Sequence, residues 1–163
     1  MGRLLDGFPR PLQAVIGWAV TIAIAIGIVL ALRAEIASPY RVPSSSMEPT
    51  LHCARPAEGC LAGTSDRIIA NRFVYRFRAP KRGEIVVFAT PPATRLACAA
   101  GGTFVKRIVG LPGERIVEQN GIVYVDGRRL IEPYVVSAER DSRSGSWPRI
   151  PAGNYFMMGD NRR

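Results

Sequence analysis

Histidine, lysine and cysteine are all scarce in this chain of 163 residues. It contains one histidine, His52, and two lysines, Lys81 and Lys106, so arginine supplies the other basic side chains. The three cysteines, at positions 53, 60 and 98, form no Cys-x-x-Cys pair, and one histidine is too few for a zinc site. The sequence therefore predicts neither a metal site nor a cofactor.

Charge is absent from the 22 residues between Pro11 and Leu32. As a helix they would span roughly 33 Å, enough to cross a bilayer core of about 30 Å. A cleavable secretory signal has a shorter apolar core of about 7–15 residues, and a buried globular helix would have a polar face. We therefore expect a short tail at residues 1–10, a transmembrane helix at 11–32 and a folded domain at 33–163.

The net charge of the chain is +9, from 22 lysines and arginines against 13 acidic residues. The arginines are scattered through strand-like segments, with no basic helix, zinc-finger pattern or helix-turn-helix pattern, so nucleic-acid binding is not expected. A basic surface beside anionic lipid head groups is the interpretation that we favour. The few charges that flank the apolar run do not decide its orientation in the membrane.

No stretch after Leu32 shows a helical period over eleven residues. Instead, β-branched and aromatic residues predict strands at 66–77, 83–90, 103–110 and 154–161. Asn120-Gly121, between two such runs, predicts a hairpin, and Asp126-Gly127 predicts a second tight turn. Residues 89–102 and 138–153 are predicted loops. The fold class is mainly β: one N-terminal transmembrane helix followed by an antiparallel β-sheet domain.

Cys53 and Cys60 enclose a segment containing proline and glycine, "CARPAEGC". This segment could close on itself through a disulfide if the domain lies outside the cytoplasm. Because Cys98 makes the number of cysteines odd, the sequence leaves the pairing open.

The segment "RVPSSSMEPTL" at 41–51 contains three consecutive serines, and a serine nucleophile needs a general base. His52 lies six residues after Ser46, but nothing in the sequence offers a carboxylate to orient it, so we do not expect it to be the base. Lys81 lies in a predicted turn, where solvent would keep it protonated.

Lys106 is the stronger candidate for the base. In a strand, alternation of side chains places Lys106 on the same face as Phe104 and Ile108. Apolar neighbours disfavour the ammonium form and lower its pKa toward the value of about 7–8 that a base needs near neutral pH. The alternative is a strand lysine that extends to solvent, and the local sequence leaves both open.

Several blocks, in order, resemble the bacterial type I signal peptidases (leader peptidases), membrane-bound Ser/Lys proteases that remove signal peptides. They are "PSSSMEPTL", "SDRIIANRFVYRF", "KRGEIVVF", "FVKRIVGLPGE" and "YFMMGDNR". A lone Ser-Met-x-Pro is weak evidence, but these blocks below one membrane helix are specific. The resemblance implies the signal-peptidase type of β-fold over nearly all of the chain after the apolar run.

The resemblance also implies roles for individual residues. Ser46 resembles the nucleophile, Lys106 the general base and Ser44 the oxyanion-hole hydroxyl, with the Ser46 N–H as second donor. Ser45 is then a spacer. Asp160 and Arg107 resemble an ion pair that supports the lysine. Positions that resemble the lining of the substrate pockets are Val42, Met47, Leu51, Phe104 and Val105.

The chain departs from the family pattern in three places. After Arg163 the family's final block normally continues with a serine that bonds the lysine and with an Asp-Ser-Arg run, so we expect an incomplete chain with weak or no activity. Arg72 stands where a lysine or other polar residue is more typical. The segment from Cys53 to Cys60 is an insertion to which the resemblance gives no function.

The leading hypothesis is a membrane-anchored serine endopeptidase that acts on the signal peptides of secretory preproteins. We expect a monomer in the plasma membrane, in contact with phospholipid, with its catalytic domain on the extracytoplasmic side. The alternative is an inactive or truncated membrane-anchored β-domain paralogue. A self-cleaving repressor of the related Ser/Lys fold is disfavoured by the apolar run, and a Ser/His signal peptidase by the block around Lys106.

Overall fold

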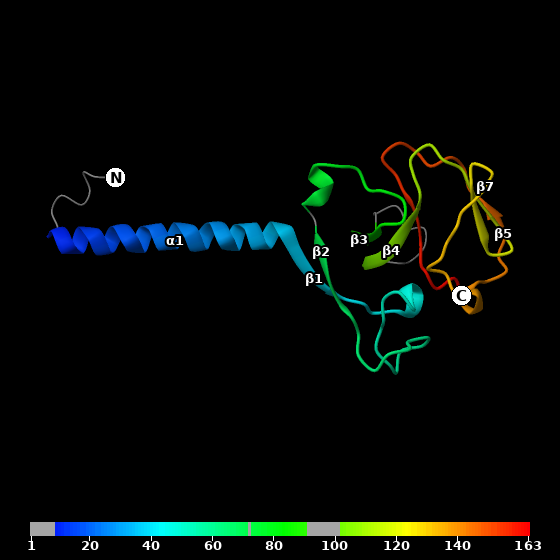
Figure 1. Ribbon diagram of the computed structural model, residues 1–163, viewed down its shortest axis with the longest axis horizontal. Helices are drawn as coiled ribbons and strands as arrows, with labels where there is room; N and C mark the ends of the chain where they lie inside the picture. Colours follow the sequence, from blue (N-terminus) through cyan, green and yellow to red (C-terminus); the bar gives the residue numbers. More distant parts are fainter. Residues whose placement is uncertain (1–8, 72, 91–101) are drawn as a thin grey trace.

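The computed structural model describes residues 9–71, 73–90 and 102–163, and it shows a long helix projecting from a β domain (Figure 1). The helix, α1 (Arg10–Ile36), includes an apolar stretch, Pro11–Leu30, that is long and apolar enough to cross a membrane. None of that stretch is buried against the β domain. The helix continues past the predicted end at Leu32, because alanine, arginine and glutamate follow and all favour helix.

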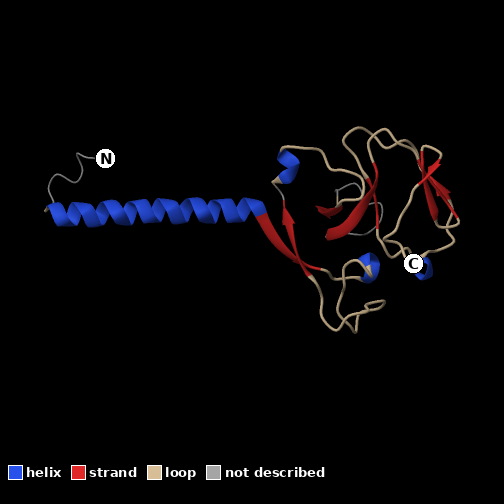
Figure 2. Cartoon of the chain, in the orientation of Figure 1, coloured by secondary structure: helices blue, strands red, loops and turns tan. Residues whose placement is uncertain are grey.

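The rest of the described chain forms three small antiparallel sheets, which confirms the predicted fold class (Figure 2). The first sheet pairs β1 (Ala37–Arg41) with β2 (Arg67–Asn71). The second has the order β3-β4-β9, and its strands are β3 (Ile85–Ala89), β4 (Thr103–Gly110) and β9 (Phe156–Met158). The third has the order β7-β6-β5-β8, and its strands are β5 (Ile116–Gln119), β6 (Ile122–Val125), β7 (Arg128–Arg129) and β8 (Gly145–Ser146).

Short 3₁₀ turns are inserted between these strands. They are η2 (Ser45–Met47), η3 (Val74–Arg76) and η4 (Ser137–Glu139). The predicted strand at 66–77 is wrong in its second half, because the strand ends at Asn71 and η3 follows. The Asn71 side-chain oxygen accepts hydrogen bonds from the backbone N–H groups of Phe73 and Val74, which turns the chain out of the sheet. Strand β1 was not predicted, and β8 lies inside a predicted loop. In the predicted loop at 89–102, residues 91–101, including Cys98, lie outside the described residues, as does Arg72.

Two hydrophobic clusters stabilise the domain. The larger joins the second and third sheets, and its buried members are Val109, Ile116, Val123, Val125 and Ile150. The smaller consists of Val42, which follows β1, with Cys53 and Cys60, packed against Leu51 and Ile68 of β2. Strand β4 contributes to the larger cluster and also contacts η2, so it connects the core to the turn that carries the three serines.

Both predicted tight turns are present. Asn120 and Gly121 have φ of 49° and 71° between β5 and β6, and Asp126 and Gly127 have φ of 46° and 80° between β6 and β7. These positive φ values are those of type I′ hairpin turns, which suit Asn-Gly and Asp-Gly pairs. The two glycines differ in their surroundings. A Cβ at position 121 would collide with the backbone carbonyl of Asp141, whereas a Cβ at 127 would meet open space.

We expect Gly121→Ala to destabilise the domain more than Gly127→Ala. Each substitution places alanine in the left-handed region, at a cost of about 1–2 kcal/mol. Gly121→Ala adds the collision with the Asp141 backbone, which we expect to cost about 1–3 kcal/mol more. Urea unfolding of both variants in detergent measures the difference. Equal losses of stability would contradict the close approach of the Asp141 backbone.

Candidate active site

The turn η2 presents Ser46 beside strand β4. It follows β1 through Val42, which is buried and whose backbone N–H donates to the carbonyl of Asp66. Within the turn, the Glu48 N–H donates to the Ser45 carbonyl at 3.0 Å. Met47 is almost fully buried, with 1% of its surface exposed, whereas Ser46 is half-buried. The buried methionine therefore fixes the turn in the domain and leaves the adjacent serine accessible.

The segment 159–161 also packs against this turn. The backbone N–H of Asn161 donates to the Ser46 carbonyl and its side-chain amide donates to the Ser45 carbonyl, each at 3.2 Å. Gly159 approaches the Ser46 carbonyl so closely that a Cβ would collide with it. The glycine and the asparagine of the Gly-Asp-Asn sequence thus fix the backbone of the serine turn, a role that the sequence did not reveal.

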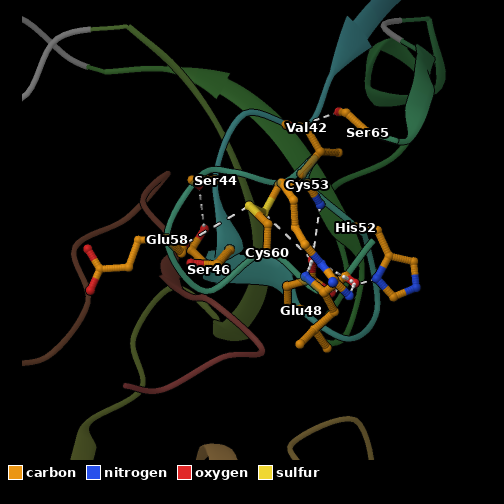
Figure 3. The surroundings of a disulfide bond; sticks show 12 residues. Val42, Ser44, Ser46, Glu48, His52, Cys53, Glu58, Cys60 and Ser65 are labelled. Carbon is orange, nitrogen blue, oxygen red and sulfur yellow. Dashed lines mark hydrogen bonds and ion pairs between the residues drawn. A yellow bond between two sulfur atoms is a disulfide. The ribbon is translucent and has the colours of Figure 1, made fainter. Parts of the chain in front are cut away.

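Ser44 and Ser46 lie together at the start of the turn. Their hydroxyl oxygens are 3.2 Å apart, and either can donate to the other (Figure 3). Ser44 is exposed and Ser46 half-buried, so both hydroxyls can reach a molecule bound from solvent.

Lys106 lies on β4 directly opposite Val86 of β3. It is partly buried, and this burial lowers the pKa of its ammonium group below the ordinary value, while the negative charge of Asp160 acts in the opposite direction. Because η2 contacts β4, the strand of the lysine and the turn of the serine are neighbours. An amine whose pKa is lowered loses its proton more readily, so Lys106 is a candidate base for a hydroxyl on the neighbouring turn.

Arg107, the next residue on the strand, forms an ion pair with Asp160. Its Nη2 and Nε lie 2.6 and 2.9 Å from the two carboxylate oxygens, and Asp160 is fully buried. The Thr50 hydroxyl donates to the same carboxylate at 2.6 Å. The guanidinium also lies 4.0 Å from the centre of the Tyr134 ring. Asp160 thus connects β4, the segment after the serine turn and the C-terminal segment.

The five residues predicted to line substrate pockets are placed differently from one another. Leu51 lines a surface cleft of about 570 Å³, a size typical of ligand sites. Phe104 is half-buried, with its ring 6.1 Å from that of Phe88. The other three, Val42, Met47 and Val105, are buried at 2%, 1% and 8% exposure.

The cleft also contains residues that sequence reasoning missed. Among them are Ile68 of β2 and Val86 of β3, and Val86 is the cross-strand partner of Lys106. The cleft therefore includes the cross-strand partner of the lysine, whereas neither Lys106 nor Ser46 is among its lining residues. The β-branched residues of these two strands were a signal, but the sequence did not show which face would be open.

His52 belongs to a different set of contacts. Its Nδ1 lies 2.6 Å from Oε2 of Glu48, and Figure 3 shows its ring directed away from Ser46. Lys81 is exposed at the start of the segment leading into β3. Among the described residues, no group of three histidine, cysteine or acidic side chains could hold a metal ion.

The disulfide left open by the sequence joins Cys53 and Cys60. Cys53 is fully buried, and Cys60 is 7% exposed. The segment that they enclose lies beside η2 (Figure 3).

Comparison with known proteins gives one consistent result. Residues 15–163 match the family described as signal peptidase, peptidase S26. Probable signal peptidase I-1 of Synechocystis is 34% identical over 94% of this chain and 72% of that protein. Probable signal peptidase I-2 of the same organism is 37% identical over 87% and 59%, and a signal peptidase I of Bacillus amyloliquefaciens is 32% identical over 93% and 75%. The chain thus spans between 59% and 75% of the length of these relatives.

We expect the pKa of Lys106 to lie below the ordinary lysine value of about 10.4, and Asp160→Asn to lower it further. The Asp160 carboxylate favours the ammonium form of Lys106, so removing its charge leaves burial unopposed. The asparagine can still bond with Arg107 and Thr50. The measurement is an NMR titration of the isotope-labelled lysine.

Asp126→Asn is the matched control for this titration, because Asp126 is an exposed acid paired with Arg149. It should leave the pKa of Lys106 unchanged. A higher Lys106 pKa in Asp160→Asn would show that the carboxylate does not act on the lysine as the geometry indicates.

Proposed function

Because the chain is a hydrolase of the signal peptidase family, peptidase S26, we propose that it cleaves signal peptides from exported preproteins with Ser46 as nucleophile and Lys106 as general base. The observation that carries this proposal is the contact between η2, which bears Ser46, and β4, which bears a partly buried lysine with a lowered pKa. Arginine could not replace that lysine, because it stays charged.

The proposed reaction proceeds through an acyl-enzyme. The neutral amine of Lys106 takes the hydroxyl proton of Ser46, and the serine oxygen attacks the carbonyl carbon of the scissile bond. The proton passes to the leaving amine as the C–N bond breaks. Water then attacks the ester, with the amine again acting as base, and releases the peptide and the serine.

Ser44 and the backbone N–H of Ser46 are the proposed donors to the oxyanion. Ser44 lies at the N-terminal cap of η2 with an extended backbone, and its hydroxyl is 3.2 Å from the Ser46 hydroxyl. A donor at this distance from the nucleophile can reach the oxygen of a carbonyl under attack. Such donors contribute about 10²–10³ in rate, because they bond mainly with the charge that develops in the transition state.

The cleft beside β2 and β3 is the proposed site for the substrate residues before the cleaved bond. Its lining includes Leu51, Ile68 and Val86, which are apolar and suit the small side chains at the end of signal peptides. We propose that Val42, Met47, Phe104 and Val105 shape this site chiefly from beneath, since three of them are buried.

We further propose that α1 spans the membrane and that the β domain lies on the extracytoplasmic side, where signal-peptide cleavage sites emerge. The apolar stretch Pro11–Leu30 supports this, since none of it is covered by the β domain. Strand β1 begins directly after the helix ends, so the serine turn stays close to the membrane surface.

We expect Ser46→Ala and Lys106→Ala each to abolish cleavage of a preprotein by the full-length protein in detergent, whereas His52→Ala retains it. The first removes the nucleophile and the second removes the base, while His52 bonds Glu48 away from Ser46. The activity kcat/KM should rise with pH through one ionisation that lies below the ordinary lysine pKa of about 10.4, because burial lowers the pKa of Lys106, and above the value of about 6.5 expected of a histidine base.

The pH dependence of kcat/KM distinguishes a lysine base from a histidine base. An acidic limb near about 6.5 that disappears in His52→Ala would replace the lysine mechanism with a histidine one. Cleavage that persists in Lys106→Ala would likewise disprove the dyad.

Ser44→Ala should lower kcat by about 10²–10³ with little change in KM, because the hydroxyl acts mainly on the transition state. Steady-state kinetics on a peptide substrate separate the two constants. Ser44→Thr, which keeps a hydroxyl, is the control and should recover part of the loss. A loss found entirely in KM would mean that Ser44 binds the substrate in its ground state.

A further inference from the structure

The disulfide-closed loop from Cys53 to Cys60, which the family resemblance leaves without a function, lies directly against the turn that carries Ser46. Both cysteines belong to the small cluster with Val42, the residue that leads into the turn. Figure 3 shows the loop, the disulfide and the two hydroxyls of Ser44 and Ser46 gathered in one region.

The first link between loop and turn is the carboxylate of Glu48. Glu48 follows Met47 and is 1% exposed. Its Oε1 accepts hydrogen bonds from the backbone N–H groups of Cys53 and Leu61, at 3.1 and 3.2 Å. Burial alone would raise the pKa of Glu48, but the bonds from His52, Leu61 and Cys53 together lower it, so the carboxylate stays charged. One side chain from the end of the turn therefore bonds with the first residue of the loop and with the residue that follows the loop.

The second link is a close contact between Gly59 and Ser45. Gly59 has φ of +73°, and a Cβ there would lie 2.7 Å from the Ser45 Oγ and 2.9 Å from its Cβ. Ser45 also presents its carbonyl to the side-chain amide of Asn161 at 3.2 Å. The residue before the nucleophile therefore contacts both the loop and the C-terminal segment.

We propose that the Cys53–Cys60 loop is a positioning element for the nucleophile, acting through the contact of Gly59 with Ser45. The disulfide limits the conformations of the loop, the loop fixes Ser45, and Ser45 sets the place of the Ser46 hydroxyl and N–H. The effect on catalysis that this inference predicts rests on the proposed function. It also gives Ser45 a role beyond that of a spacer.

The proposal predicts that Gly59→Ala lowers kcat by about 10–100-fold with little change in KM, because a displacement of about 1 Å at a reacting group can cost that much. Gly153→Ala is the matched control. Gly153 has φ of +74°, almost that of Gly59, but a Cβ there would meet nothing within 4 Å. Both variants therefore carry the same backbone strain, and only Gly59→Ala presses on Ser45.

A second variant tests whether the effect passes through Ser45. Ser45→Gly removes both atoms that a Cβ at 59 would meet, so Ser45→Gly alone should already lower kcat, and adding Gly59→Ala to it should lower kcat far less than Gly59→Ala does in the wild-type chain. Equal kcat in Gly59→Ala and Gly153→Ala, or the same fold-loss from Gly59→Ala in the wild-type and Ser45→Gly chains, would overturn the proposal.

Reducing the Cys53–Cys60 disulfide should also lower kcat. A small dithiol reduces the Cys53–Cys60 bond, so that two protons and two electrons pass to the two sulfurs and the dithiol closes to its own cyclic disulfide. We expect a fall in kcat of about 10-fold or more. Cys53→Ala combined with Cys60→Ala should show the same fall without reductant and no further response to the dithiol. A wild-type kcat that is unchanged after complete reduction would overturn the proposal.

Hydrogen exchange tests the positioning apart from catalysis. The N–H groups of Glu48 and Asn161 donate to the carbonyls of Ser45 and Ser46, so their exchange reports the order of the turn. Both should exchange faster in Gly59→Ala and in the double cysteine variant than in Gly153→Ala. Faster exchange supports the positioning role even if the wild-type chain cleaves no preprotein, an outcome that would count against the proposed function alone. Unchanged exchange would overturn the inference whatever the activity.

Discussion

The buried carboxylate of Asp160 is the group on which the arrangement of the candidate site depends. It accepts two hydrogen bonds from Arg107 on β4 and one from Thr50, and it lies between Gly159 and Asn161, which contact the serine turn. A buried charge without a partner is costly, and removing one partner of such a pair typically costs about 3–5 kcal/mol. The Asp160 carboxylate therefore holds strand β4, the residue Thr50 after the serine turn and the C-terminal segment together.

The same carboxylate also affects the pKa of Lys106, which is subject to two opposing effects. Burial lowers the pKa of the lysine, whereas the negative charge of Asp160 raises it. Arg107 weakens the effect of Asp160 on the lysine. Its permanently charged guanidinium bonds both carboxylate oxygens and so offsets part of their negative charge. Neighbouring residues on a strand point to opposite faces, so one basic residue can neutralise the aspartate while the next remains free to lose its proton.

The sequence predicted the parts of this protein that local patterns determine. The strand at 103–110 has the predicted bounds, and the hairpin at Asn120-Gly121 is present, because alternation and turn chemistry are local. Strand β1 was missed because Ala37–Arg41 contains a serine and a proline and forms only by pairing with β2. For the site, the resemblance indicated Ser46 and Lys106, but it could not show that Gly59 meets Ser45. That contact depends on tertiary packing, which brings the disulfide loop against the serine turn.

The geometry of the serine turn explains why several groups that are distant in the sequence contact it. A 3₁₀ turn of three residues makes few hydrogen bonds of its own, and their geometry is poorer than in an α-helix. A reacting hydroxyl must nevertheless be placed within about 0.5 Å of its productive position. The precision therefore has to come from contacts with the rest of the domain. Met47 of the turn is buried in the core, Asn161 donates to two carbonyls of the turn, and Glu48, which caps the turn, connects it to the disulfide loop. These contacts join the turn to different parts of the chain, so removing any one of them should leave the Ser46 hydroxyl less firmly positioned.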